Sequence, residues 1–379
     1  MIYSFPYVLL FLFYVYLYFS CKKKIKKNSF ISEKKIRRKY YFIACVVYLF
    51  FYGLRGFIFT DWISYYNYFY EIGSGDFQEM NLLEPGYVYS NLIVYKIFPD
   101  YFVFQFVWTA IDVFLLYKIF KRETGKYFLL AFALLIAFFD GIQINLMRNI
   151  KSILIFFYAI EYIRQNNFKK YLICILVAMF FHVTSIIYIP IYFFIKSKRK
   201  NILIIFSIVS IFISLIGFGK IEGILTLLGA LLGGKFNVID TYLSTGVNPG
   251  ITLGFLYRTF LLIIILWKYD SLSKQNCINT NLAVLYLSLN LFFNSVLTLR
   301  DRIPSLFILG FIIIFPYILS TIKNKTYKYI FLFINVVCIV GFVYNPHKTI
   351  IAKYENVLFK SQDADKAEQR IFDNLEERE

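Results

Sequence analysis

Several residue types and patterns are scarce in this 379-residue chain. Only 17% of the residues are charged, two are histidines and five are cysteines. The cysteines form no CxxC pair, and no His-rich spacing accompanies them, so we expect neither a disulfide framework nor a metal site or other cofactor. No segment between the apolar runs is long enough for a separate soluble catalytic domain. Any activity must therefore reside in the apolar runs or in the short loops between them.

Apolar residues, in contrast, are abundant. They make up 59% of the chain, and the mean hydropathy is +0.62. A soluble domain contains about 45–50% apolar residues. A helix that crosses a bilayer needs roughly 20 of them in succession, and such runs recur from end to end. The composition indicates an all-α, polytopic integral membrane protein.

The basic residues indicate how the chain is oriented. No charge precedes the apolar run 2–19, whereas residues 21–39 hold ten Lys or Arg and one Glu. A signal peptide carries its positive charge before its apolar core, so we expect a retained helix whose N-terminus lies outside. The net charge of +18 lies mostly in short loops, which is the positive-inside pattern and not that of a nucleic-acid-binding protein.

Continuing this alternation predicts about twelve spans and two outside termini. The expected spans are 2–19, 40–54, 101–120, 127–146, 149–163, a hairpin of two within 171–196, 201–218, 251–267, 281–298, 303–320 and 328–344. They form a membrane domain over residues 1–345, with outer loops at 56–100 and 220–250. The polar tail, 346–379, is expected to be a short helix or disordered. No internal repeat supports an inverted-repeat transporter.

Isolated charged residues gather near the outer face of this topology. They are Arg55, Asp61, Glu84, Arg148, His182, Arg300, Asp301 and Arg302. Ionisable groups near membrane depth are functional candidates, and the guanidinium fork suits phosphate. Several such arginines could hold a lipid-linked pyrophosphate. Alternatively, Arg55 pairs with Asp61, and Arg300 or Arg302 with Asp301, and these pairs only hold helix ends together.

The other candidates also have two interpretations each. Glu84 precedes a Pro-Gly turn and a short interfacial or re-entrant helix, so it either caps that helix or serves as a base. His182, near the tip of the hairpin, is either a satisfied polar residue or a base or phosphate donor. Tyr65 and Tyr66 belong either to an aromatic belt or to a sugar-binding surface.

Taken in order, these motifs resemble the EpsG family, a branch of the Wzy-type polysaccharide polymerases. The matching segments are LRG…TDWISYYNYF, LEPGYVYSNLI, LMRNIKSILIFFYAI, MFFHVTSIIYIPIYFF and YNPHK. Two departures stand out. The family's Gly-Thr-Asp-Tyr is Phe-Thr-Asp-Trp at 59–62, and its Asn-Pro-Tyr is Asn-Pro-His at 345–347. The likeness extends over residues 50–195 and less clearly to 345.

This resemblance implies a specific activity. Wzy-type proteins join oligosaccharide repeat units of O-antigen, capsule or exopolysaccharide at the outer face of the bacterial inner membrane. Donor and acceptor are both linked to undecaprenyl pyrophosphate, a chain-length regulator is a possible partner, and the fold is of the metal-independent GT-C kind. The implied pyrophosphate ligands are Arg148, Arg300 and Arg302, with Arg55 as a weaker fourth. Glu84, Asp61 and His182 are the base candidates, and Tyr65 and Tyr66 would line the sugar site.

Three other functions compete with this interpretation. A lipid-linked glycan flippase should place charges at the midplane and open to both faces, but the charges here look one-sided. An O-antigen ligase usually has a large late outer loop, and a membrane O-acetyltransferase needs a catalytic histidine with a route for the acyl donor. A purely structural membrane protein would leave the clustered arginines without a purpose.

Overall fold

The computed structural model describes residues 3–27, 32–75, 83–216, 250–360 and 362–376. These residues form α-helices and short 3-10 helices, and the one β interaction found among them is an isolated bridge between Arg55 and Asn356. The all-α expectation is therefore confirmed for the described ranges. The chain divides into two compact units, residues 1–192 with 333–379, and residues 193–332.

Helices suited to a membrane occur in both units. Four helical stretches in the described ranges are long and apolar enough to span a bilayer: Phe5–Lys27, Tyr101–Glu123, Leu299–Thr321 and Lys325–His347. Four shorter apolar helices accompany them, at Gly125–Phe138, Val183–Phe194, Lys200–Ile216 and Leu253–Trp267. The chain is thus membrane-embedded in character, while twelve spans and a GT-C fold remain predictions. The expected outer loop at 220–250 lies outside the described residues except for Gly250.

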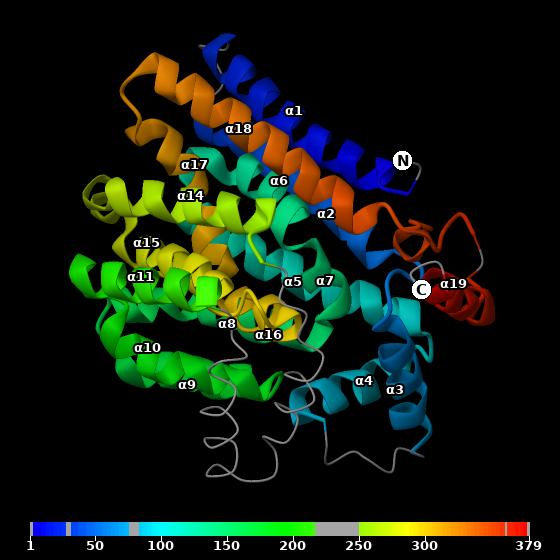
Figure 1. Ribbon diagram of the computed structural model, residues 1–379. Helices are drawn as coiled ribbons and strands as arrows, with labels where there is room; N and C mark the ends of the chain where they lie inside the picture. Colours follow the sequence, from blue (N-terminus) through cyan, green and yellow to red (C-terminus); the bar gives the residue numbers. More distant parts are fainter. Residues whose placement is uncertain (1–2, 28–31, 76–82, 217–249, 361, 377–379) are drawn as a thin grey trace. The chain divides into compact units, whose positions relative to one another are not determined.

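The first unit begins with a packed group of helices (Figure 1). α1 (Phe5–Lys27) lies along α6 (Phe128–Phe138) and α2 (Glu33–Gly53), and α2 also packs on α5 (Tyr101–Glu123). Aromatic contacts join them, because the Tyr14 hydroxyl donates to the Ala44 carbonyl oxygen at 3.0 Å and its ring stacks on Phe132. The expected span 127–146 is divided at Phe139 into α6 and α7 (Asp140–Asn145).

Residues 171–196, predicted to be a hairpin of two helices, form such a hairpin. α9 (Phe168–Met179) ends just before His182, and η3 (Val183–Ile187) and α10 (Tyr188–Phe194) follow. The Tyr171 hydroxyl donates to the Tyr188 carbonyl oxygen at 2.5 Å, and the rings of Phe168 and Tyr192 lie 4.9 Å apart. These contacts bring the two ends of the segment together and place His182 at the tip. α9 packs along α8 (Met147–Arg164).

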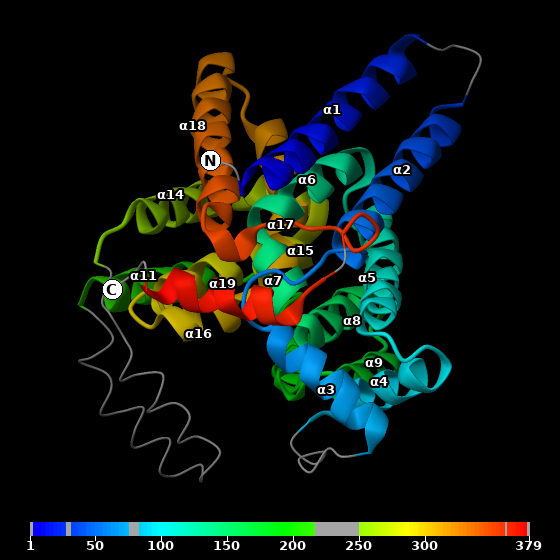
Figure 2. The same ribbon diagram turned by 90° about the vertical axis from the view of Figure 1, so that its right-hand side faces the viewer.

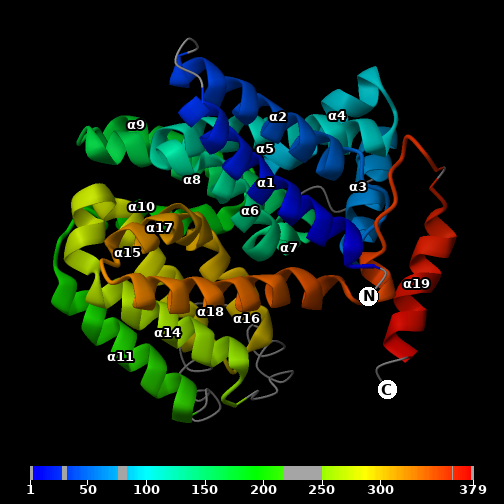
Figure 3. The same ribbon diagram turned by 90° about the horizontal axis from the view of Figure 1, so that it is seen from above.

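The second unit is built around one buried helix (Figure 3). α15 (Tyr269–Phe292), kinked at Asn276, contacts α11 (Lys200–Ile216), α14 (Leu253–Trp267) and α17 (Ile308–Thr321). α16 (Leu297–Arg302) and η6 (Pro304–Phe307) connect α15 to α17. α18 (Lys325–Tyr344) starts in this unit and enters the first. It begins three residues before the predicted span 328–344 and ends at the same residue.

The polar tail shares the core of the first unit. After η7 (Asn345–His347) and η8 (Ile350–Ala352), the chain runs antiparallel to residues 54–59: Gly56 N–H donates to the Glu355 carbonyl oxygen at 2.7 Å, and Val357 N–H to that of Leu54 at 3.0 Å. α19 (Ala364–Glu376) follows (Figure 2). Its Ala367 belongs to an aromatic cluster with Phe57 and Trp62. The tail contains the expected short helix, and its few apolar residues suffice because α3 (Trp62–Ser74) and the residues before it supply the rest of the core.

Phe59 lies in a backbone conformation that favours glycine. Its φ is 62°, and the EpsG pattern has glycine there. We expect Phe59→Gly to unfold with a free energy about 1 kcal/mol higher than Phe59→Ala, because both lose the ring but only alanine keeps the left-handed strain. Unfolding midpoints of the two purified variants in detergent measure this difference. Equal midpoints would contradict the assignment of strain.

Candidate functional site

The first element of the candidate site is an ion pair between two predicted residues. Arg148, in the first turn of α8, donates from Nη1 to Glu84 Oε2 at 2.7 Å. Glu84 precedes α4 (Pro85–Ile97), yet its side chain makes no capping hydrogen bond to that helix. Both side chains are only partly buried, with 26% and 14% exposed. The Glu84 side chain therefore pairs with Arg148 and does not cap α4.

The tip of the hairpin joins this pair. Val183 N–H donates to Glu84 Oε1 at 3.3 Å, and His182 Nδ1 lies 2.8 Å from the Thr184 hydroxyl oxygen. Gly86 N–H also donates to the Phe180 carbonyl oxygen at 2.8 Å. The start of α4 and the hairpin tip are thus held together by backbone contacts, and three of the predicted residues, Glu84, Arg148 and His182, belong to one neighbourhood.

Gly86 is required for this approach. A Cβ atom there would lie 2.6 Å from the Phe180 carbonyl oxygen, so the two segments would have to separate. We expect Gly86→Ala to lower the free energy of unfolding by about 1–3 kcal/mol, as overpacking does, and to displace Glu84 from Arg148. Gly141→Ala is the matched control, because nothing lies within 4 Å of its added Cβ. Thermal unfolding in detergent compares the two, and equal midpoints would refute the tight contact.

Aromatic residues form one wall beside the pair. The Tyr65 hydroxyl donates to the Asn145 carbonyl oxygen at 2.9 Å, and burial raises its pKa to about 12, so it stays protonated. Arg148 lies over the Tyr87 ring, 5.8 Å from its centroid. Tyr66 points elsewhere: its ring contacts Phe57, Trp62, Tyr70 and Tyr101 within the aromatic cluster. Of the two predicted tyrosines, Tyr65 and not Tyr66 therefore lies next to the pair, where Tyr87 lies as well.

Asp61 stands at the start of α3. It is the residue before the helix, its carbonyl accepts from Tyr65 N–H at 3.3 Å, and its Oδ1 accepts from the Thr60 hydroxyl at 3.1 Å. These contacts tie Asp61 to its own turn. Whether it acts as a base stays a prediction.

The electrostatics of the pair favour an anion. Arg148 lies at the positive end of the α8 dipole, where a cation is unfavourable unless a negative group is close. Its Nε is buried without a hydrogen-bond partner, and so is the Tyr87 hydroxyl. Buried donors of this kind normally have partners. Besides the Nη1 group that donates to Glu84, the site therefore offers Arg148 Nε–H and the Tyr87 hydroxyl as donors to an anionic ligand.

A second polar group lies inside the helices of the first unit. Lys151 Nζ is 2.5 Å from Asp112 Oδ1 and 4.3 Å from the centroid of the Trp108 ring. The Gln143 amide donates to Asp112 Oδ2 at 3.2 Å and accepts from the Tyr48 hydroxyl at 3.1 Å. Lys151 is 2% exposed and Asp112 fully buried. This is a fully desolvated ion pair.

His347 has a defined place next to this group. Its Nε2 lies 2.5 Å from Asp140 Oδ2, its Nδ1 lies 2.6 Å from the Val343 carbonyl oxygen, and its ring stacks on Tyr7 at 3.7 Å. Asp140 also accepts from the Tyr52 hydroxyl. The histidine that replaces the family's tyrosine at 347 thus joins α18 to α7 and α1.

Arg55 is buried, with 3% of its surface exposed. Its guanidinium donates to the Tyr52 carbonyl oxygen at the end of α2, and its own carbonyl accepts from the Gln105 amide at 2.7 Å. A cation at a helix C-terminus is stabilised by the dipole. This placement gives Arg55 a structural role, and its contact with pyrophosphate stays a prediction.

The late arginines belong to the second unit. Arg300 Nε lies 3.1 Å from Asp301 Oδ1, which is the pairing foreseen as the structural alternative, and Arg302 ends α16 as an exposed residue. Arg258, on α14, lies within electrostatic range of Arg300 and Asp301. Within the described ranges, no group of three or more His, Cys, Asp or Glu could hold a metal ion.

The sequence interpretation missed Asp112, Asp140, Lys151 and Arg258. Each is a charged residue inside or beside an apolar run, which is the signal that could have found it. The site candidates were the charged residues of the outer loops and helix ends, whereas the predicted topology places these four residues within spans.

Comparison with known proteins bears on this arrangement. Neither the search of curated proteins nor the search of solved structures returned a match. The family model described as "EpsG family" matches residues 38–356, which include Glu84, Arg148 and His182 as well as the buried Asp112–Lys151 pair. Since this match covers most of the chain, the protein is a member of the EpsG family.

Proposed function

We propose that this protein is a membrane glycosyltransferase that joins oligosaccharide repeat units carried on undecaprenyl pyrophosphate, at the outer face of the bacterial inner membrane. The observation that carries the proposal is the Glu84–Arg148 pair, in a chain of the EpsG family. A carboxylate and a guanidinium stand side by side there, a candidate base and a candidate phosphate ligand. Those are the two groups that glycosyl transfer from a pyrophosphate requires.

The proposed chemistry uses both members of the pair. A hydroxyl of the acceptor sugar attacks the anomeric carbon of the donor, the bond from that carbon to the pyrophosphate oxygen breaks, and undecaprenyl pyrophosphate leaves with the electron pair. Glu84, or His182 beside it, takes the proton of the hydroxyl. Arg148 stabilises the charge that develops on the leaving pyrophosphate, because its fork donates two parallel hydrogen bonds to phosphate oxygens.

The ion pair also orders these events. While Arg148 is bound to Glu84, one carboxylate oxygen accepts from the guanidinium and the other from Val183 N–H. A pyrophosphate that takes over the guanidinium releases Glu84 toward the acceptor hydroxyl. Donor binding and activation of the base are thereby coupled. Tyr65 would contribute a hydroxyl to the sugar site, and contacts of Arg300 and Arg302 with pyrophosphate stay a prediction.

A deletion strain tests this proposal. The strain is complemented with wild type, Arg148→Ala or Glu84→Ala, and lipid-linked or surface glycan is resolved as a gel ladder, with the membrane level of each variant checked by blot. We expect single repeat units on deletion, a ladder with wild type, and no ladder with either variant. Intact ladders on deletion would refute the polymerase. Single units that never reach the outer face would point to the flippase. Normal ladders with altered acylation would point to the O-acetyltransferase, and normal ladders with altered attachment to lipid A would point to the ligase.

A further inference from the structure

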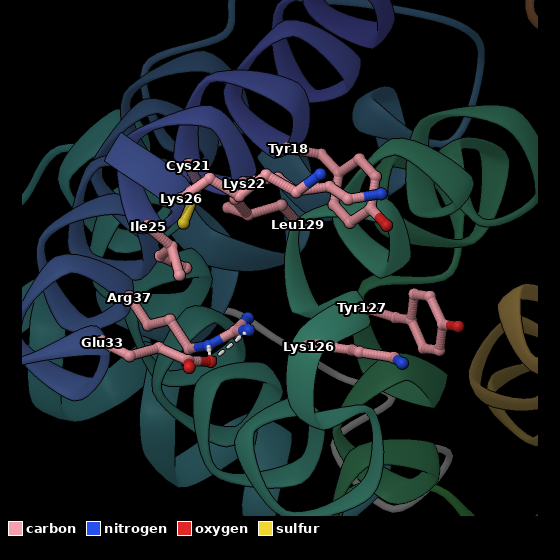
Figure 4. A pocket seen from close by; sticks show the side chains of 10 residues that line it. All are labelled: Tyr18, Cys21, Lys22, Ile25, Lys26, Glu33, Arg37, Lys126, Tyr127 and Leu129. Atoms are coloured by element: carbon pink, nitrogen blue, oxygen red, sulfur yellow. Dashed lines mark hydrogen bonds and ion pairs between the residues drawn. The ribbon is translucent and has the colours of Figure 1, made fainter. Parts of the chain in front are cut away.

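The first unit also contains a cavity that is lined by none of the candidate site residues. It has a volume of about 290 Å³ and lies between α1, α2 and the turn that joins α5 to α6 (Figure 4). Four basic side chains line it: Lys22, Lys26, Arg37 and Lys126. Glu33 is the one acid among the lining residues, and it is paired with Arg37 at 2.5 Å. The three lysines therefore face the cavity with no acidic partner on its described walls.

The frame of the cavity is rigid. The Tyr41 hydroxyl, on α2, donates to the Gly125 carbonyl oxygen at 2.7 Å, and the Tyr41 ring stacks on Phe128 at 3.9 Å. These contacts fix the turn that carries Lys126 against α2. Figure 4 shows Lys126 and the Arg37–Glu33 pair on one side of the space and the α1 side chains on the other. The backbone that carries Lys126 is thus fixed against α2 before any ligand arrives, and an anion gains from such preorganisation of the walls.

An apolar stripe on α1 borders this cavity at one edge, near Lys26. Its exposed side chains follow one helix face at steps of three and four residues: Phe5, Leu9, Leu12, Tyr16 and Phe19. Seven residues beyond Phe19, the same face presents Lys26, which lines the cavity. A surface of this kind suits a molecule with an apolar chain and an anionic end.

We propose that the cavity binds the phosphate headgroup of an anionic phospholipid, with the acyl chains lying on the α1 stripe. Basic pockets between transmembrane helices on the cytoplasmic side bind such headgroups, and the excess of lysine and arginine over residues 21–39 predicts that this end of α1 is cytoplasmic. The lipid occupies a site separate from the Glu84–Arg148 pair. It anchors the α1–α2 hairpin to the turn before α6.

Native mass spectrometry of the purified full-length protein tests the proposal. Phosphatidylglycerol and phosphatidylcholine with identical acyl chains are offered in detergent, with inorganic phosphate in a separate arm. We expect wild type to retain phosphatidylglycerol in preference. A Lys22→Gln, Lys26→Gln, Lys126→Gln variant should lose affinity by about fivefold for each lysine, the contribution of one basic residue at an anionic membrane surface.

The matched control removes three basic residues elsewhere in the chain, one just before α18 and two in its first turn. Lys323→Gln, Lys325→Gln, Lys328→Gln alters the charge equally without touching the cavity, and should bind as wild type does. Equal losses in the two variants, or no preference for phosphatidylglycerol, would overturn the proposal. Displacement of the lipid by inorganic phosphate at equal concentration would also overturn it and indicate a site for free phosphate. If the triple variant elutes as an aggregate, Lys126→Gln alone carries the same test, since its side chain is exposed.

Discussion

We expect the charge-exchange variant Arg148→Glu, Glu84→Arg to abolish repeat-unit polymerisation. The exchange rebuilds an ion pair between the same two positions, now 2.7 Å apart in the native protein. If the pair only fastens α4 to α8, the exchanged pair should restore the ladder. If Arg148 binds pyrophosphate at the positive end of α8, the exchange puts a carboxylate there, and the donor is repelled.

Two single variants make this result specific. Arg148→Lys keeps the charge but lacks the planar fork, so we expect the rate of elongation to fall on the order of 100-fold, as removal of one transition-state donor does. Arg164→Gln is the control, because Arg164 ends the same helix and is likewise paired with an acid, Glu123, at 2.6 Å. The gel ladder of the complemented deletion strain is the readout. A full ladder from the exchanged pair would reduce Arg148 to a structural residue.

Breaking the buried Asp112–Lys151 pair is expected to have the second large effect, on stability. Lys151→Met leaves the Asp112 carboxylate desolvated, and within the described residues the Gln143 amide is then its remaining hydrogen-bond donor. Removing one partner of a buried pair lowers the free energy of unfolding by about 3–5 kcal/mol. We therefore expect a large fall in the unfolding midpoint in detergent and in the amount of protein in the membrane.

A double variant separates charge from packing. Asp112→Asn, Lys151→Met removes both charges, and the asparagine oxygen can still accept from Gln143, so most of the lost stability should return. Lys118→Met is the control, since Lys118 lies on the same helix as Asp112 but is exposed over the Phe114 ring. A surface change of this kind alters stability by about 0.5 kcal/mol or less. Equal midpoints for Lys151→Met and Lys118→Met would show that the pair contributes nothing.

The helices could be located from local patterns alone. Apolar runs bounded by basic loops predicted 101–120, 201–218 and 251–267, and the structure has helices at Tyr101–Glu123, Lys200–Ile216 and Leu253–Trp267. The hairpin with His182 at its tip also followed from the basic residues at both ends of the segment. These features are local because a helix satisfies its own backbone hydrogen bonds, and a membrane leaves an apolar chain little other choice.

The partners of the charged residues could not be read from the chain in the same way. Glu84 and Arg148 are 64 residues apart, and Asp140 and His347 are 207 apart. By residue type, Asp61, Glu84 and His182 are all candidates for the base, and that choice stays a prediction. Only the packing of α4 on the hairpin tip shows that Glu84 lies against Arg148. Likewise, the polar tail looked separate, although its backbone pairs with residues 54–59. Local patterns indicate where most helices lie, although not every boundary, as the division of 127–146 at Phe139 shows. Side-chain pairing depends instead on which helix faces meet, and many distant residues determine that together.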